Sequence, residues 1–200
     1  LVVAMINAGV IGYAASAVVF LILTFLLAVG SRAGWQGRSV LLASFVTFLW
    51  SVFASVQSYV GIFDNTYLSL LDLLREGSWL LFLIILLANA RFSGEVDKLL
   101  LLSGKVVLPV VACLCLYIFL SELGVFTHTY LLDFTSLITI RLIVVIMGLI
   151  FVEQLFRNSH PENRWAVKFL FFGIGGIFAY DFYFYADALV FNRVDIDIWM

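Results

Sequence analysis

Residues 178–191 read FAYDFYFYADALVF, an aromatic and apolar run that contains two aspartates, Asp181 and Asp187. The run completes an apolar stretch that is longer than the about 20 residues a helix needs to cross a bilayer. Six such stretches occur: Ala8–Gly30, Ser39–Val60, Leu70–Ala90, Leu99–Leu120, Tyr130–Val152 and Ala166–Phe191. They predict an all-α protein, a polytopic bundle of about six transmembrane helices.

Composition supports a membrane protein. The 200 residues are 64% hydrophobic and 12% charged, whereas soluble domains are about 45–50% apolar and about 25% charged. A globular core of this size could not hide so much apolar surface, so the expected partner is the lipid bilayer. The net charge of −2, with no basic patch or arm, does not indicate a nucleic-acid partner.

The orientation follows from the basic residues. Eight of the eleven lie in or beside the loops after the first, third and fifth stretches: Arg32, Arg38, Arg91, Lys98, Lys105, Arg157, Arg164 and Lys168. Because cytoplasmic loops are enriched in Lys and Arg, we expect these loops inside and the N-terminus outside. The tail NRVDIDIWM (192–200) then also lies outside, and we expect the chain to be a fragment followed by further spans.

Four charged residues on three of these stretches are predicted to share one depth. Counting about 1.5 Å per helical residue from the cytoplasmic end places Asp181 roughly 20 Å, Arg141 roughly 18–24 Å and Glu76 roughly 22 Å deep. Arg75 lies one residue further. Since an unpaired charge in hydrocarbon is costly, we expect the four to face the bundle interior and to neutralise one another. Arg141 is the expected partner of Asp181.

The other aspartates near the outer surface are predicted to need no partner. Asp187 lies about nine Å beyond Asp181 by the same rise per residue, and Asp72 and Asp133 fall at comparable heights. Water should reach all three carboxylates there. Tyr180 shares a helical face with Asp187.

The last stretch is predicted to pack inside the bundle. Tyr185 shares a face with Asp181, and its hydroxyl could donate to a buried carboxylate. The preceding segment FFGIGGIFAY (171–180) carries a strip of small residues, in which Gly175 and Ala179 have the spacing that lets helix backbones approach closely. We therefore expect this strip at a helix–helix contact.

The predicted charged layer has three interpretations. It could be structural, an ion-pair network that fixes helix register. It could be a ligand-sensing or proton-sensitive site open to the outer leaflet, because intramembrane charge marks function by default. It could also line a substrate pathway, although paired Gly/Pro-broken spans typical of transporters do not stand out.

Catalytic and metal-binding motifs are not evident in the sequence. His128 and His160 are predicted on opposite sides of the membrane, so they cannot share a metal. Cys113 and Cys115 point to different sides of a helix, which disfavours a disulfide between them. With no HExxH, nucleophile-elbow or Walker pattern, we expect no cofactor and no catalytic residues in this chain.

Two segments carry a family resemblance. The stretch VEQLFRNSHPENRWAVKFLFFGIGGIFAYDFYFYADALVFNRVDIDIW (152–199) resembles the membrane region of sensor histidine kinases of the PEP-CTERM system, the PrsK family. The stretch LLDLLREGSWLLFLIILL (70–87) resembles the third span of that family, including its acid–Leu–Leu–Arg–acid pattern. The likeness extends over most of the chain and is least specific in the first two spans.

The resemblance implies the input region of a larger kinase in a bacterial inner (plasma) membrane. In that family the membrane region precedes a cytoplasmic GAF domain, a dimerisation and phospho-acceptor domain and an ATP-binding domain. The kinase forms a homodimer and signals to a response regulator that controls exopolysaccharide and PEP-CTERM protein production. Residues 1–200 would be the sensor domain, unable to autophosphorylate by itself.

Residues expected to couple a signal form one set: Arg75, Glu76, Arg141, Asp181, Asp187, Tyr180 and Tyr185. The first four would make the coupling layer, and the rest would flank its outer mouth. A small membrane transporter or transporter subunit is the alternative function, and a structural assembly subunit is a third. A pocket between the third, fifth and sixth spans would favour sensing, and a through-going path would favour transport.

Overall fold

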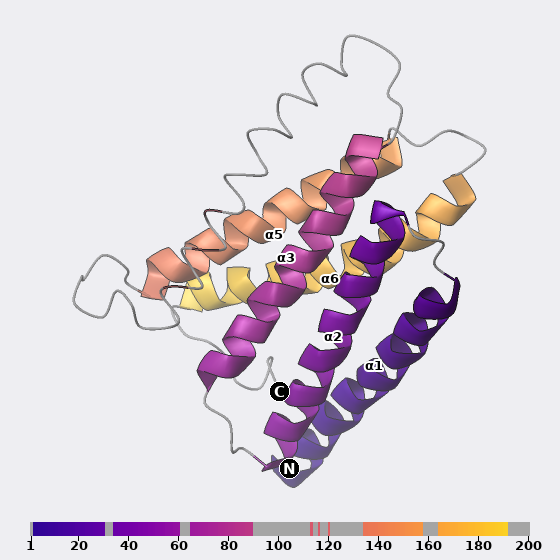
Figure 1. Cartoon of the computed structure of the whole chain (residues 1–200). Helices are drawn as coiled ribbons and strands as arrows, with labels where there is room; N and C mark the ends of the chain where they lie inside the picture. Colours follow the sequence, from indigo (N-terminus) through magenta and orange to yellow (C-terminus); the bar gives the residue numbers. More distant parts are fainter. Residues whose placement is uncertain are drawn as a thin grey trace. The chain divides into compact units, whose positions relative to one another are not determined.

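The computed structural model of the chain describes residues 2–30, 34–60, 65–89, 113, 116, 120, 134–157 and 164–191. Five helices are described there: α1 (Val2–Gly30), α2 (Trp35–Val60), α3 (Asn65–Asn89), α5 (Phe134–Arg157) and α6 (Arg164–Phe191), all labelled in Figure 1. Each overlaps one predicted span and extends beyond it at one end or both. The fourth predicted span, Leu99–Leu120, lies outside the described residues except at positions 113, 116 and 120.

Four of the described helices are long and apolar enough to cross a membrane. The apolar segments are Gly9–Gly30, Trp35–Val60, Thr135–Arg157 and Lys168–Phe191. Helix α3 differs from them because Asp72, Arg75 and Glu76 interrupt its apolar sequence. The described part of the chain is therefore all-helical and has the long apolar helices of a membrane protein. A total of about six spans stays a prediction.

The chain divides into two compact units. Among the described residues, unit 1 contains α1, α2 and most of α3, and unit 2 contains the end of α3 with α5 and α6. The boundary falls inside α3, after Phe82.

In unit 1, α1 and α2 pack side by side (Figure 1). Their contact is partly polar, because the hydroxyls of Ser16 and Ser51 lie 3.0 Å apart. The rings of Tyr13 and Trp50 meet edge to face with centroids 5.5 Å apart. Trp50 also packs with Leu68 of α3 in a small apolar cluster. Hydroxyl contacts of this kind, worth about 0.6 kcal/mol each in a membrane, supplement apolar packing between these helices.

The buried face of α2 consists mostly of small and hydroxylated side chains. Its buried members are Ser39, Ala43, Ser44, Thr47, Trp50, Ser51 and Ala54. Thr47 and Ser51 donate to the backbone carbonyls of Ala43 and Thr47, one turn earlier, at 2.8 and 2.9 Å. These bonds satisfy the hydroxyls of Thr47 and Ser51 within α2 itself, which lowers the cost of burying them.

In unit 2, α5 and α6 pack as an antiparallel pair with one register. Their described contacts recur every one or two helical turns along both helices: Arg141–Tyr185, Gly148–Phe178, Val152–Gly175 and Phe156–Phe171. Phe178 is fully buried, and its ring lies so close to Gly148 that any added Cβ would fall 2.6 Å from it. Glycine at position 148 therefore lets the ring seat directly against the α5 backbone.

Candidate functional site

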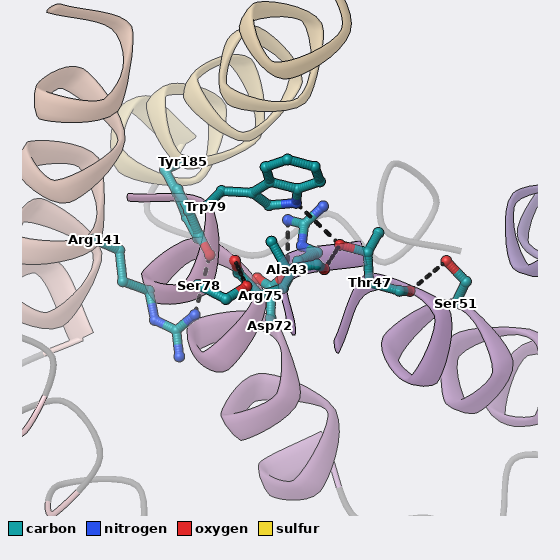
Figure 2. Close-up of polar contacts among 9 residues, drawn as sticks. All are labelled: Ala43, Thr47, Ser51, Asp72, Arg75, Ser78, Trp79, Arg141 and Tyr185. Atoms are coloured by element: carbon teal, nitrogen blue, oxygen red, sulfur yellow. Dashed lines mark hydrogen bonds and ion pairs between the residues drawn. The ribbon is translucent and has the colours of Figure 1, made fainter. Parts of the chain in front are cut away.

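Arg75 on α3 is held inside unit 1 by two contacts. Its Nη2 atom lies 2.8 Å from Oδ1 of Asp72, one turn earlier on the same helix. Figure 2 draws Asp72 and Arg75 among the polar contacts of this region. The guanidinium carbon of Arg75 lies 4.3 Å from the ring centroid of Trp50 on α2. A desolvated guanidinium over an indole is stabilised by about 2 kcal/mol, so Trp50 offsets part of the cost of burying Arg75, which is 5% exposed.

A second polar contact ties α3 to α2 one turn further on. The indole Nε1 of Trp79 donates to the hydroxyl of Thr47 at 3.0 Å, and both residues are buried. Because Thr47 also donates to its own helix, the Trp79 bond uses a hydroxyl that is already oriented. Glu76 lies between these contacts in sequence and is 1% exposed. These contacts form a polar seam between α2 and α3, made of Thr47, Trp50, Asp72, Arg75 and Trp79. Glu76 is also buried on α3.

The structure corrects the prediction for Asp72. We expected water to reach this carboxylate near the headgroups, but it is 5% exposed and paired with Arg75. The expectation of a water-exposed carboxylate is wrong because residues three apart on a helix share a face. Burying Arg75 therefore brings Asp72 into the same interior. Three carboxylates and two guanidiniums are buried among the described residues (Asp72, Glu76, Asp181, Arg75 and Arg141), so this set is not formally neutral.

In unit 2, Arg141 on α5 reaches α6. Its Nη1 atom donates to the hydroxyl of Tyr185 at 3.0 Å, and its guanidinium carbon lies 5.8 Å from the centroid of that ring. Arg141 is 4% exposed and Tyr185 is 2% exposed. The sequence predicts Tyr185 as a donor to Asp181. Its oxygen accepts a bond from Arg141, and the donation to Asp181 stays a prediction.

Asp181 is buried, at 4% exposed, as its predicted inward orientation requires. Tyr185 follows it by one turn, so Arg141 contacts the face of α6 that carries Asp181. The ion pair between Arg141 and Asp181 stays a prediction. The Arg141–Tyr185 contact favours it, because Tyr185 lies one helical turn from Asp181.

The remaining candidates, Asp187 and Tyr180, both lie on α6 in unit 2. Asp187 is half-buried, and Tyr180 is 45% exposed, in contrast to Tyr185. Arg75 and Glu76 belong to unit 1, and Arg141 and Asp181 belong to unit 2. A layer that joins all four residues stays a prediction. Asp133, His128, His160 and Cys115 lie outside the described residues.

Among the described contacts, the predicted small-residue strip of α6 meets α5 at Gly175. An added Cβ at Gly173 or Gly176 would meet no described atom within 4 Å, and at Gly175 it would make only an ordinary contact with Val152. The close approach is instead made by Gly148 of α5. Spacing alone cannot tell which face of a helix meets its neighbour, whereas the large ring of Phe178 determines where a glycine is required.

The described residues do not gather metal ligands, since no three His, Cys, Asp or Glu side chains among them come together. What the two buried sites share is a cation fixed by an aromatic residue of the neighbouring helix, Trp50 for Arg75 and Tyr185 for Arg141. A guanidinium in such a site can hold two helices together, or it can change its hydrogen-bond acceptor from one residue to another.

Replacing Tyr185 with phenylalanine tests the contact of Arg141. We expect Tyr185→Phe to lower the free energy of unfolding by about 1–2 kcal/mol, near the upper end of hydrogen-bond energies measured between membrane helices. The same substitution in an Arg141→Leu background should cost about 1 kcal/mol less, because the bond is already gone. Unfolding by SDS in mixed micelles, followed by circular dichroism, measures both, and additive costs would contradict the contact.

Comparison with known proteins gives no match: no family model, curated protein or solved structure corresponds to this chain.

Proposed function

We propose that this chain is the membrane-embedded input region of a sensor histidine kinase of the PEP-CTERM system. Two observations support the proposal. Residues 152–199 and 70–87 resemble the membrane region of such kinases, and charged residues are buried within helices that have the length and composition of membrane spans. The single structural observation that carries the proposed signalling is the Arg141–Tyr185 contact, which holds a buried cation between two apolar helices, because charge within hydrocarbon is costly.

The proposed mechanism is a shift between two arrangements of α5 and α6. A ligand or proton can shift such an equilibrium only if it interacts differently with the two arrangements. Arg141 can meet that condition, because its guanidinium can donate to Tyr185 or to Asp181 on the same face of α6. A move of the Arg141 guanidinium from one acceptor to the other would shift α5 against α6. That shift would change the next contact of the pair, between Gly148 and Phe178.

The rest of the proposal concerns the whole protein. About six helices would span the bacterial inner membrane with the N-terminus outside. Kinase domains beyond residue 200 would form the homodimer and transfer phosphate to a cytoplasmic response regulator controlling exopolysaccharide and PEP-CTERM protein production.

The test uses the full-length protein in inner-membrane vesicles with radiolabelled ATP. We expect ATP-dependent phosphorylation, and we expect Asp181→Asn to change its steady-state level about five-fold or more, the lower range of allosteric coupling. The substitution keeps the shape of the side chain and removes the negative charge of the acceptor that the proposal gives Arg141 as an alternative to Tyr185. Phe182→Leu is the matched control, because Phe182 neighbours Asp181 in sequence but is 40% exposed.

Two outcomes would count against the proposal in different ways. A full-length protein that is abundant but never phosphorylated is not a histidine kinase. Normal phosphorylation that Asp181→Asn and Phe182→Leu leave equally unchanged would keep the kinase and remove Asp181 from its signalling.

A further inference from the structure

One end of the α5–α6 pair combines exposed basic and aromatic side chains. Arg157 is the last residue of the apolar segment Thr135–Arg157, and Lys168 is the first residue of the segment Lys168–Phe191. In helices that cross a bilayer, residues at these positions lie where hydrocarbon gives way to headgroups. The α5–α6 register brings the two ends together, because Phe156 and Phe171 are in contact.

Three rings connect the two basic residues. The centroids of Phe156 and Phe171 are 5.1 Å apart, and those of Phe171 and Phe172 are 5.6 Å apart. The Nζ atom of Lys168 lies 6.0 Å from the centroid of Phe172. Phe172 is 63% exposed and the adjacent Phe169 is 65% exposed. We name Phe156, Arg157, Lys168, Phe169, Phe171 and Phe172 the basic aromatic end.

The charge of this surface is available to a ligand. Arg157 pairs with Glu153 at 3.4 Å, but the two side chains are 75% and 63% exposed. Exposed pairs of this kind contribute little and exchange readily with other partners. Lys168 is exposed, and its described contact is with a ring rather than with a carboxylate. An anion at this end of the helices would thus meet two cations, Arg157 and Lys168, whose present interactions are weak.

We propose that the basic aromatic end binds the headgroups of anionic phospholipids. The guanidinium of Arg157 can donate two parallel hydrogen bonds to a phosphodiester, and Lys168 supplies a second point charge. The exposed rings of Phe169 and Phe172 fit the boundary between headgroups and acyl chains. A zwitterionic lipid offers the same phosphate but adds a cation, which the two basic residues disfavour.

Unit 1 shows the same arrangement independently. Trp35 begins the apolar segment Trp35–Val60 and is 76% exposed. The guanidinium carbon of Arg38 lies 6.0 Å from the centroid of its ring. A cation one turn from an exposed aromatic residue at a span end therefore occurs in both units, which suits lipid headgroups better than a site for one soluble ligand. Lipid binding there does not depend on the proposed kinase function.

The test is retention of lipid by the purified full chain in native mass spectrometry, with equimolar phosphatidylglycerol and phosphatidylcholine of matched acyl chains. We expect phosphatidylglycerol to be retained about five-fold or more over phosphatidylcholine, the preference that one basic residue near an anionic surface provides. Arg157→Gln with Lys168→Gln should remove most of that preference. Glu153→Gln should raise it, because it frees Arg157 and deletes a repelling carboxylate.

Equal retention of the two lipids by the unmodified chain would overturn the proposal. So would a preference that neither the double variant nor Glu153→Gln alters. All three side chains are exposed, so circular dichroism should show wild-type helicity in each variant. Should the double variant not fold, the single Lys168→Gln and the opposite sign expected for Glu153→Gln still decide the outcome.

Discussion

Replacing Arg75 with leucine should lower the free energy of unfolding by about 3–5 kcal/mol, the usual cost of removing one member of a buried ion pair. The substitution removes the guanidinium that lies 2.8 Å from Asp72 and 4.3 Å from the ring of Trp50. The carboxylates of Asp72 and Glu76 would remain buried on one turn of α3 without that cation. Unfolding by SDS in mixed micelles, followed by circular dichroism, measures the loss.

Two further variants separate charge from packing at this site. Arg75→Lys keeps the charge but loses the planar group that covers Trp50, so we expect an intermediate loss of about 1–2 kcal/mol. Adding Asp72→Leu to Arg75→Leu should recover about 1–3 kcal/mol, because replacing both partners removes the stranded carboxylate.

The control is the same type of pair on the surface. Arg157 and Glu153 also lie one turn apart on one helix, at 3.4 Å, but both are exposed. Arg157→Leu should therefore change the free energy of unfolding by about 1 kcal/mol or less. Equal losses from Arg75→Leu and Arg157→Leu would contradict the view that burial makes the Asp72–Arg75 pair important.

The sequence predicted which side chains are buried better than it predicted their partners. Arg75, Glu76, Arg141 and Asp181 are all buried, because a charge inside an apolar helix can be tolerated only away from lipid. The i, i+3 spacing of Asp72 and Arg75 in LLDLLREG indicates their pairing. Helical facing, rather than depth along the span, decides which of these side chains meet.

Contacts between helices could not be predicted from the position of charged residues within the apolar stretches. Trp50 over Arg75 and Thr47 beside Trp79 depend on how α2 and α3 align, which no local spacing fixes. The signal available was the repeat of small hydroxylated residues on α2, which indicates a face buried against another helix. Among the described contacts, the closest approach to a glycine is made at Gly148 of α5 by Phe178, and not at the α6 glycines that the spacing indicated.

Placing a methyl group at Gly148 should destabilise unit 2 because the ring of Phe178 occupies that space. An added Cβ would fall 2.6, 2.7 and 2.8 Å from three atoms of the ring, closer than carbon atoms approach without a shift. Phe178 is fully buried, so the ring has little room to move. We expect Gly148→Ala to lower the free energy of unfolding by about 1–3 kcal/mol, the usual cost of overpacking.

The sign of the effect distinguishes packing from helix propensity. Gly176→Ala is the matched control on the partner helix, where no described atom lies within 4 Å of the added carbon. It should stabilise α6 by up to about 1 kcal/mol, as alanine does in an open helical position. In a Phe178→Leu background the cost of Gly148→Ala should fall by about 1 kcal/mol, because the smaller side chain leaves space. If Gly148→Ala instead stabilises the protein as Gly176→Ala does, Phe178 does not seat against α5. The register that brings Arg141 to Tyr185 would then lose its central contact.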